Sequence, residues 1–343
     1  MDWKAWLGES CLRLVNIPSP SGFTGAIRAQ VSGELEAMGF APAKTNKGSL
    51  LCALGGSGAP LILAAHLDTL GAMVRSVKAN GHIRLTQIGG YAWNSVENEN
   101  CRLFTRDGRE LSGTIYLSQP AAHVADVAAQ KRDDTTLELV LDERVKSAEE
   151  LKTLGVETGC FVAFEPRAVL TPSGYIKSRH LDDKASAAVL LGLAKAVSLG
   201  EIALSRKVYL LLTVQEEIGH GGAAGLPEDA VEILSVDMGC VGEDLGCDET
   251  MVSICVKDSV GPYDYEMTSR LIALAKEKGL AYAADVYPRY SSDADAALRA
   301  GHDLRHGLIG PGVFASHGYE RAHTEGLWNT FALLKAFVSG ITA

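Results

Sequence analysis

The most constraining feature of this sequence is the uninterrupted apolar run KVYLLLTV at residues 207–214. A strand without polar alternation must be covered on both faces, which is the position of a central strand in an α/β sheet. Residues 183–197 are almost entirely apolar over a helical length, so we expect a buried helix against that sheet. Further apolar runs predict strands at 49–54, 60–66, 232–237 and 251–256, and helical periodicity predicts helices at 2–15, 23–39, 262–279 and 325–339.

A stretch of different texture interrupts this α/β pattern. From about residue 71 to residue 170, short alternating segments are separated by Gly, Asp and Asn, and they lie at 82–88, 102–105, 113–117, 136–141 and 160–164. This pattern is typical of a small all-β module, either a barrel or a sandwich, with one short helix expected at 141–155. Because the α/β texture returns after Ser178, we expect an α/β domain over 1–70 and 168–343 and an inserted β domain over 71–167.

Composition and charge narrow the class of protein. The 343 residues exceed one ordinary core and predict about two domains. The N-terminus lacks the basic and apolar regions of a signal peptide, so we expect a cytoplasmic protein. A net charge of −10 argues against nucleic acid and membrane surfaces as partners. The seven scattered cysteines are expected to be free thiols.

Five candidate metal ligands follow predicted strands, lie in a late loop or begin a helix: His66, Asp182, Glu217, Asp237 and His323. Each has an ordinary alternative when taken alone, such as a helix cap or a solvated turn. Together, two imidazoles and three carboxylates form a donor set that suits zinc, cobalt or manganese. Open α/β sheets also bind ligands at the carboxyl ends of their strands. The two oxygens of Asp182 could bridge a pair of cations.

Two further acids are candidates for catalysis. Glu216 and Glu217 are adjacent in an extended segment, so their side chains point to opposite sides. One acid can then bind a metal while Glu216 accepts the proton of an attacking water. Asp68 follows His66 by two residues and can orient its ring.

The glycine-rich turn after these glutamates has a competing interpretation. Residues 219–224, GHGGAA, fit the G-x-G-x-x-A pattern of a dinucleotide-binding turn. Two preceding glutamates would repel a pyrophosphate, and the segment lies far along the chain after an insertion. We therefore expect these glycines to let the chain turn tightly past a metal site.

The segments AAHLDTLGA, SRHLDDKAS, LLTVQEEIGHGGA, SVDMGC and RAHTEG occur in the order seen in the tetrahedral aminopeptidases, also called the glutamyl-aminopeptidase or endoglucanase-like family. The chain resembles this family over nearly its whole length, and within it a bacterial subgroup linked to N-acetylglutaminylglutamine amide osmolytes. The resemblance implies a three-layer α/β/α metallopeptidase domain of the phosphorylase/hydrolase-like type with an inserted small β-barrel. In the family, this barrel mediates dimers that commonly assemble into dodecamers.

The resemblance also implies a role for each candidate residue. His66 and Asp237 correspond to the ligands of one metal and Glu217 and His323 to those of the other, with Asp182 as the bridge, Glu216 as the general base and Asp68 behind the His66 ring. Lys257, Asp258 and Asp293 lie where relatives build the substrate pocket, although a lone lysine more often lies on a solvated face.

The implied activity is a metal-dependent aminopeptidase that removes N-terminal residues from short peptides through a metal-activated water. It implies two divalent ions per subunit, with zinc expected first and cobalt or manganese as alternatives. A related di-metal amidohydrolase acting on a small N-acylated dipeptide or osmolyte is the competing hypothesis. A non-catalytic scaffold is disfavoured, because a scaffold needs the ligands but not Glu216.

Overall fold

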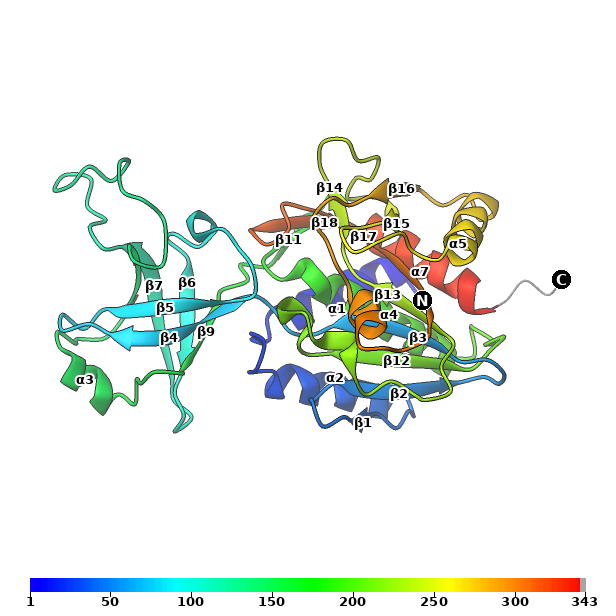
Figure 1. Cartoon of the computed structure of the whole chain (residues 1–343), viewed down its shortest axis with the longest axis horizontal. Helices are drawn as coiled ribbons and strands as arrows, with labels where there is room; N and C mark the ends of the chain where they lie inside the picture. The colour runs from blue at the N-terminus through cyan, green and yellow to red at the C-terminus, as the bar shows by residue number, and fades with distance from the viewer. Residues whose placement is uncertain (340–343) are drawn as a thin grey trace.

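The computed structural model describes residues 1–339, and residues 340–343 of the expected α/β domain lie outside the described part. Figure 1 shows two lobes, a β-barrel at the left and a larger α/β domain at the right. The fold is thus a mixed α/β domain with a large sheet and a closed six-stranded barrel. This agrees with the fold class predicted from the sequence, and the closed barrel decides between barrel and sandwich.

The large sheet has its longest path in the order β1-β2-β12-β3-β13-β17-β18-β11-β10. Its centre consists of β12 (Val208–Thr213), β3 (Leu61–His66), β13 (Glu232–Val236) and β17 (Arg305–Phe314), and neighbours in this series run parallel. The remaining strands are β1 (Ala43–Lys44), β2 (Leu50–Gly55), β10 (Val169–Leu170), β11 (Tyr175–Ser178), β14 (Gly239–Val241), β15 (Val252–Lys257), β16 (Tyr282–Val286) and β18 (Glu320–His323). The four central strands therefore present their carboxyl ends at one edge.

Both faces of this sheet are covered, as the apolar run at 207–214 predicts. Leu61 and Leu63 of β3 belong to the core formed with α1 (Trp3–Val15), α4 (Leu181–Ser198) and α7 (Thr324–Ser339). Ile62 belongs to a second core with Ala294 of α6 (Asp293–Arg299). Full burial of each such aliphatic side chain contributes roughly 1.5–3 kcal/mol. The two other helices of the domain are α2 (Gly25–Ala37) and α5 (Tyr265–Glu277).

The barrel closes in the order β4-β5-β8-β7-β6-β9 around an aliphatic core. Its strands are β4 (Gly71–Val77), β5 (Ile83–Ile88), β6 (Asn100–Phe104), β7 (Glu110–Leu117), β8 (Leu137–Leu141) and β9 (Phe161–Phe164). The helix expected at 141–155 is shorter, α3 (Ala148–Thr153). It begins late because β8 continues to Leu141 and because Ser147 caps the helix, its Oγ accepting from Glu150 N at 3.2 Å.

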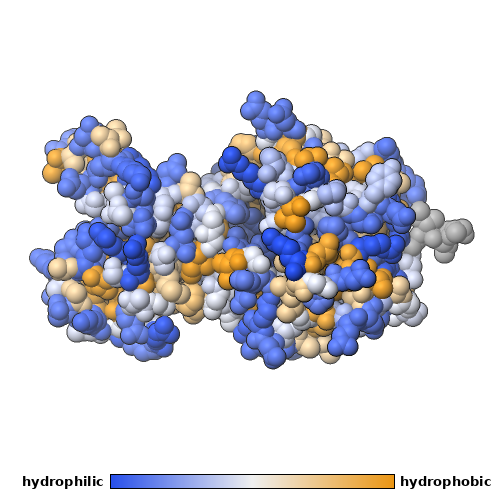
Figure 2. Space-filling model, in the orientation of Figure 1, coloured by the Kyte–Doolittle hydropathy of each residue, from blue (hydrophilic) through white to orange (hydrophobic). Residues whose placement is uncertain are grey.

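Two further expectations concern the chain as a whole. All seven cysteines are free, as predicted. Within the described range, no helix combines the length and the apolar character that a membrane crossing requires. Figure 2 shows hydrophobic side chains on the visible face in small separate patches among polar ones.

Candidate metal centre and active site

The candidate site lies at the edge where the central parallel strands end. His66 is the last residue of β3, and Asp237 directly follows β13. Glu216 and Glu217 follow β12 in a short 3-10 helix, η2 (Glu216–Ile218). Asp182 is the second residue of α4. Residues distant in sequence therefore converge because parallel strands share one carboxyl edge.

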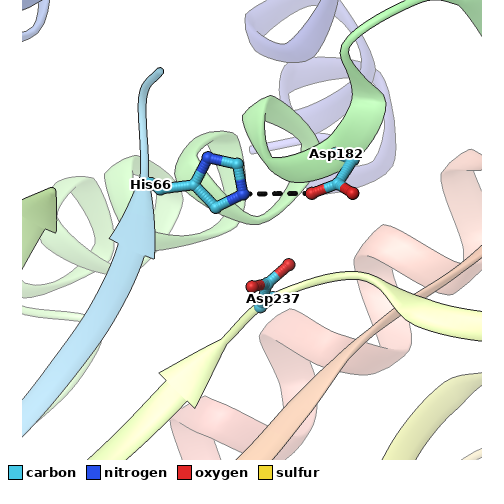
Figure 3. A group of neighbouring side chains, drawn as sticks. All are labelled: His66, Asp182 and Asp237. Carbon is cyan, nitrogen blue, oxygen red and sulfur yellow. Dashed lines mark hydrogen bonds and ion pairs between the residues drawn. The ribbon is translucent and has the colours of Figure 1, made fainter. Parts of the chain in front are cut away.

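His66, Asp182 and Asp237 form the first group of possible ligands, and their side chains point toward one another (Figure 3). One ligand atom of each lies within 4.8 Å of the others. His66 Nε2 is 3.0 Å from Asp182 Oδ1, and His66 Nδ1 is 2.8 Å from the main-chain oxygen of Asp68. A proton on Nδ1 satisfies this carbonyl and leaves the Nε2 lone pair for a cation.

Asp182, Glu217 and His317 form a second group that meets the same distance criterion. His317 Nε2 lies 3.3 Å from Asp182 Oδ2 and 3.8 Å from Glu217 Oε2. Asp182 thus turns one oxygen toward each group. This is the arrangement that a carboxylate bridging two cations requires.

The prediction that His323 is the fifth ligand is wrong, because the structure places His317 in the second group instead. His323 Nε2 contacts the main-chain oxygen of Ser173 at 2.8 Å, and its Nδ1 accepts from Glu325 N at 3.0 Å. Its ring packs edge-on against Tyr175, with centroids 4.8 Å apart. Both ring nitrogens are therefore engaged by the protein itself.

The register of β18 against β11 explains this correction. Glu320 pairs with Ser178, whereas His323 pairs with Tyr175. Asp182 comes shortly after Ser178 in the chain, so the Glu320 end of β18 lies toward Asp182. His323 is three residues farther along β18 than Glu320, a separation of about 10 Å. A sequence signal for His317 did exist, because it follows the apolar run of β17 just as Asp237 follows β13.

His317 is held from both lobes. Glu320 is 2% exposed, and its carboxylate accepts from His317 N at 3.0 Å and from Asp182 N at 3.1 Å. The His317 ring Nδ1 also bonds to the main-chain oxygen of Gly90, which follows barrel strand β5. Glu320, which the sequence analysis did not select, therefore ties a shared acid to a histidine of the second group.

Asp68 is fully buried and positions more than one residue of the site. Its Oδ1 is 3.7 Å from His66 Nδ1, consistent with the expected place behind the ring. The same carboxylate accepts from Glu216 N at 3.2 Å, from Glu217 N at 3.4 Å and from Ser21 Oγ at 2.5 Å. Asp68 therefore fixes the turn that presents both glutamates.

The site is short of positive charge within the described chain. Burial, with the charge of Asp182 added, raises the pKa of Glu217 well above its usual range and that of Asp237 to about 7. Burial is also the main cause of the raised pKa of Glu216. Burial alone would lower the pKa of His66, but the bond to Asp182 and nearby acids raise it well above its usual value.

The residues present fit divalent cations. Glu217 Oε1 is buried without a hydrogen-bond partner among the described residues. An uncompensated buried carboxylate is costly, whereas a metal ion satisfies several such oxygens together. Two imidazoles and three carboxylates in two groups also match the donors preferred by zinc, cobalt and manganese.

Two adjoining cavities open onto these groups. The first has a volume of about 340 Å³, and its lining includes Glu216, Glu217 and Asp237. The second, of about 570 Å³, extends to Tyr91 and Cys240. The residues shared by the two linings are Asp182, Arg289, Tyr290 and His317. The shared residues place the two ligand groups at the junction of the cavities.

The three residues predicted for the substrate pocket do not line either cavity. Asp293 is buried, and its Oδ2 accepts from Thr213 Oγ1 at 2.6 Å. Asp258 is fully buried and accepts from Tyr263 Oη at 2.8 Å. Lys257 is exposed and donates to the Asp258 main-chain oxygen at 2.6 Å. Both acids are engaged by internal partners, so the structure corrects this prediction.

The glycines of the GHGGAA turn serve close packing. A Cβ on Gly221 would lie 1.8 Å from Asp293 Oδ1, and one on Gly222 would lie 2.2 Å from the Asp293 main-chain oxygen. Gly222 N also donates to Asp293 Oδ1 at 2.7 Å. These glycines let the turn after Glu217 approach the start of α6, which agrees with a tight turn beside the site.

The sheet-edge site and the inserted barrel define a class of α/β hydrolytic proteins, and comparison with known proteins identifies the family. The profile of the M42 glutamyl aminopeptidase family matches residues 48–333. The protein named "Putative aminopeptidase YhfE" from Bacillus subtilis (strain 168) is 43% identical over 333 residues, which cover 96% of each chain. The chain belongs to the M42 glutamyl aminopeptidase family, as its resemblance predicts, and is a hydrolase of the peptidase class.

Solved structures share the fold at lower identity. The aminopeptidase APDkam598 from the archaeon Desulfurococcus kamchatkensis superimposes with a TM-score of 0.88 at 22% identity, covering 99% of this chain and 96% of that one. The TET1 peptidase of Pyrococcus horikoshii, which assembles into a tetrahedron or a large octahedral shell, gives 0.86 at 21% identity, covering 98% and 100%. Both include the α/β domain and the insertion.

Proposed function

We propose that this chain is a metal-dependent aminopeptidase that removes N-terminal residues from short peptides. The observation that carries the proposal is the pair of ligand groups sharing Asp182, with Glu216 beside them. Family membership supports the peptidase class.

His66, Asp182 and Asp237 would hold one divalent cation, and Asp182, Glu217 and His317 would hold the other. When bound, the pair supplies a Lewis acid for the scissile carbonyl and lowers the pKa of a water molecule. The mixed imidazole and carboxylate donors favour zinc, with cobalt or manganese as the alternatives.

Glu216 is the proposed general base. Its Oε2 lies 3.9 Å from His66 Nε2, and its side chain is 14% exposed toward the first cavity. The burial that raises its pKa makes it a better proton acceptor than an ordinary glutamate. Glu216 would take a proton from the attacking water and deliver it to the leaving amine, while Asp68 holds its main chain in place.

A requirement for a free α-amino group is supported by family membership, because the matched family and the Bacillus subtilis relative are both named as aminopeptidases. The cavity volumes of about 340 and 570 Å³ suit short peptides. We further propose a cytoplasmic homo-oligomer built on barrel-mediated dimers. The assemblies of the Pyrococcus horikoshii neighbour support the homo-oligomer.

The test is hydrolysis of matched free and N-acetylated amino-acid anilides and dipeptides by the purified chain with zinc, cobalt or manganese. A chelator serves as the control for metal dependence. We expect metal-dependent cleavage of the free-amine substrates alone. Cleavage of the acylated substrates alone would overturn the aminopeptidase and establish the specialised amidohydrolase.

A further inference from the structure

Arg289 lies at the wall of the candidate site and carries a positive charge. It lines both cavities, and it is the only arginine or lysine among the described residues that line them. The other charged side chains shared by the two linings are Asp182 and His317, which belong to the proposed cation groups. Arg289 therefore offers the cavities a positive charge that the proposed metal ligation does not use.

The main chain around Arg289 is fixed by its neighbours. Tyr287 N donates to Lys257 O at 2.9 Å, and Tyr290 Oη donates to Met238 O at 3.0 Å. The Tyr287 and Tyr290 rings pack with centroids 5.1 Å apart. Two anchored tyrosines thus flank Arg289 and hold its backbone at the cavity wall.

The Arg289 guanidinium has no ion-pair or hydrogen-bond partner within residues 1–339. Arg13 and Arg132 each pair with a glutamate, whereas Arg289 forms no ion pair or side-chain hydrogen bond in this range. A planar guanidinium presents paired N–H donors that match the two oxygens of a carboxylate. It remains available for a ligand that enters either cavity.

Charge balance identifies the chemistry of such a ligand. The acids at the site would repel a carboxylate that approached without a compensating cation. Once Asp182, Glu217 and Asp237 are neutralised by bound cations, Arg289 is the remaining lining group that can pair with one. A carboxylate located a few bonds from the scissile carbonyl would lie in the same cavities.

We propose that Arg289 is a substrate-binding residue that selects short peptides carrying a carboxylate close to the scissile bond. The inference rests on the proposed aminopeptidase function. The carboxylate can belong to an acidic N-terminal side chain or to the C-terminus of a dipeptide, and both sources present the same chemistry to the guanidinium.

Two matched substrate pairs separate these sources: glutamyl against glutaminyl anilide, and alanyl-alanine against its C-terminal amide. The wild-type chain, Arg289→Gln and Arg289→Lys are assayed with added zinc, and kcat/KM is measured for each member. In one pair, we expect Arg289→Gln to reduce the preference for the carboxylate member about 10- to 100-fold. Arg289→Lys keeps the charge without the paired donors, so its preference for the carboxylate member should lie between those of the wild-type chain and Arg289→Gln. The affected pair identifies the source of the carboxylate.

Arg299→Gln is the matched control, because Arg299 is exposed at the end of α6 and lines neither cavity. It makes the same change in net charge and should leave both preferences at the wild-type ratio. Turnover by the wild-type chain with unchanged ratios in Arg289→Gln overturns the inference alone. Absence of metal-dependent turnover of all four substrates by the wild-type chain defeats the proposed function and the inference together.

Discussion

The buried carboxylates of the barrel and those of the sheet edge differ in whether the chain supplies a cationic partner. In the barrel, Glu138 is 1% exposed and is met by Lys78 Nζ and by His82 Nδ1, the latter 2.9 Å away. At the border of the barrel, Glu99 is 3% exposed and is met by Arg179 Nε at 2.5 Å. Each of these acids thus has a cationic partner from the chain itself.

At the sheet edge, four acids crowd around two histidines, and those acids are Asp182, Glu216, Glu217 and Asp237. Their buried charges are not balanced by lysine or arginine partners within residues 1–339. Burying an unpaired charge is costly, so without a cation these acids tend to take up protons, as the raised pKa values of Glu216, Glu217 and Asp237 indicate, whereas a bound cation would favour their charged form. The contrast separates carboxylates that are paired with cationic side chains of the fold from carboxylates that are suited to binding a cation.

The sharpest way to test this contrast is Glu216→Gln, which removes a proton acceptor without changing the shape of the side chain. Loss of a general base should lower kcat about 100- to 10,000-fold. The metal content should stay at the wild-type level, because Glu216 belongs to neither ligand group. Steady-state kinetics with metal analysis checks both expectations, and near-normal turnover would remove Glu216 from catalysis.

The paired acids of the barrel border should instead respond in stability. Arg179→Met leaves Glu99 with the half-exposed Arg167 as its cationic partner, at 3.0 Å, so the loss in the free energy of unfolding should approach but not exceed the roughly 3–5 kcal/mol of breaking a buried pair. Urea unfolding measures the loss. The exposed pair of Arg75 and Asp134 provides the control, since Arg75→Met should cost less than about 1 kcal/mol. Equal effects of the two variants would contradict the structural role of the buried pair.

The two competing histidines give a smaller but more local test. His317→Ala should weaken metal binding by at least about 10- to 100-fold, because the second group loses an imidazole. His323→Ala should bind metal as the wild type does, since that ring contacts Ser173 and Tyr175. Competition with a chelator gives both affinities. The reverse result would restore His323 as the ligand.

The smallest expected effect concerns the thiols, which are buried in both lobes. Burial raises the pKa of Cys11, Cys240 and Cys247 to about 12, so their reactive thiolate form is scarce at pH 8. Alkylation of the native chain should therefore be slow, with half-buried Cys240 at the cavity reacting first. Mass spectrometry counts the modified thiols, and denaturant should expose all seven. Rapid modification of Cys11 in the native chain would show that its core opens.

Much of the fold could be predicted from the sequence, because the local pattern of apolar and polar residues reflects which faces of an element are buried. The apolar run of β12 predicts a strand covered on both faces, and the structure places β12 between β2 and β3 inside the sheet. Alternation between 71 and 170 predicts a β module, although it could not decide between a barrel and a sandwich. Closure depends on the pairing of β4 with β9, which are far apart in the chain.

By itself, the sequence determined that acids and histidines follow the strands of an α/β sheet, and it singled out His66, Asp182, Glu217 and Asp237. The tertiary structure decided which further histidine joins them. His317 comes three residues after β17 and His323 ends β18, and the register of β18 against β11 places His323 away from Asp182. The same holds for Arg289, whose place at both cavities depends on packing between distant segments and leaves no local pattern in the sequence.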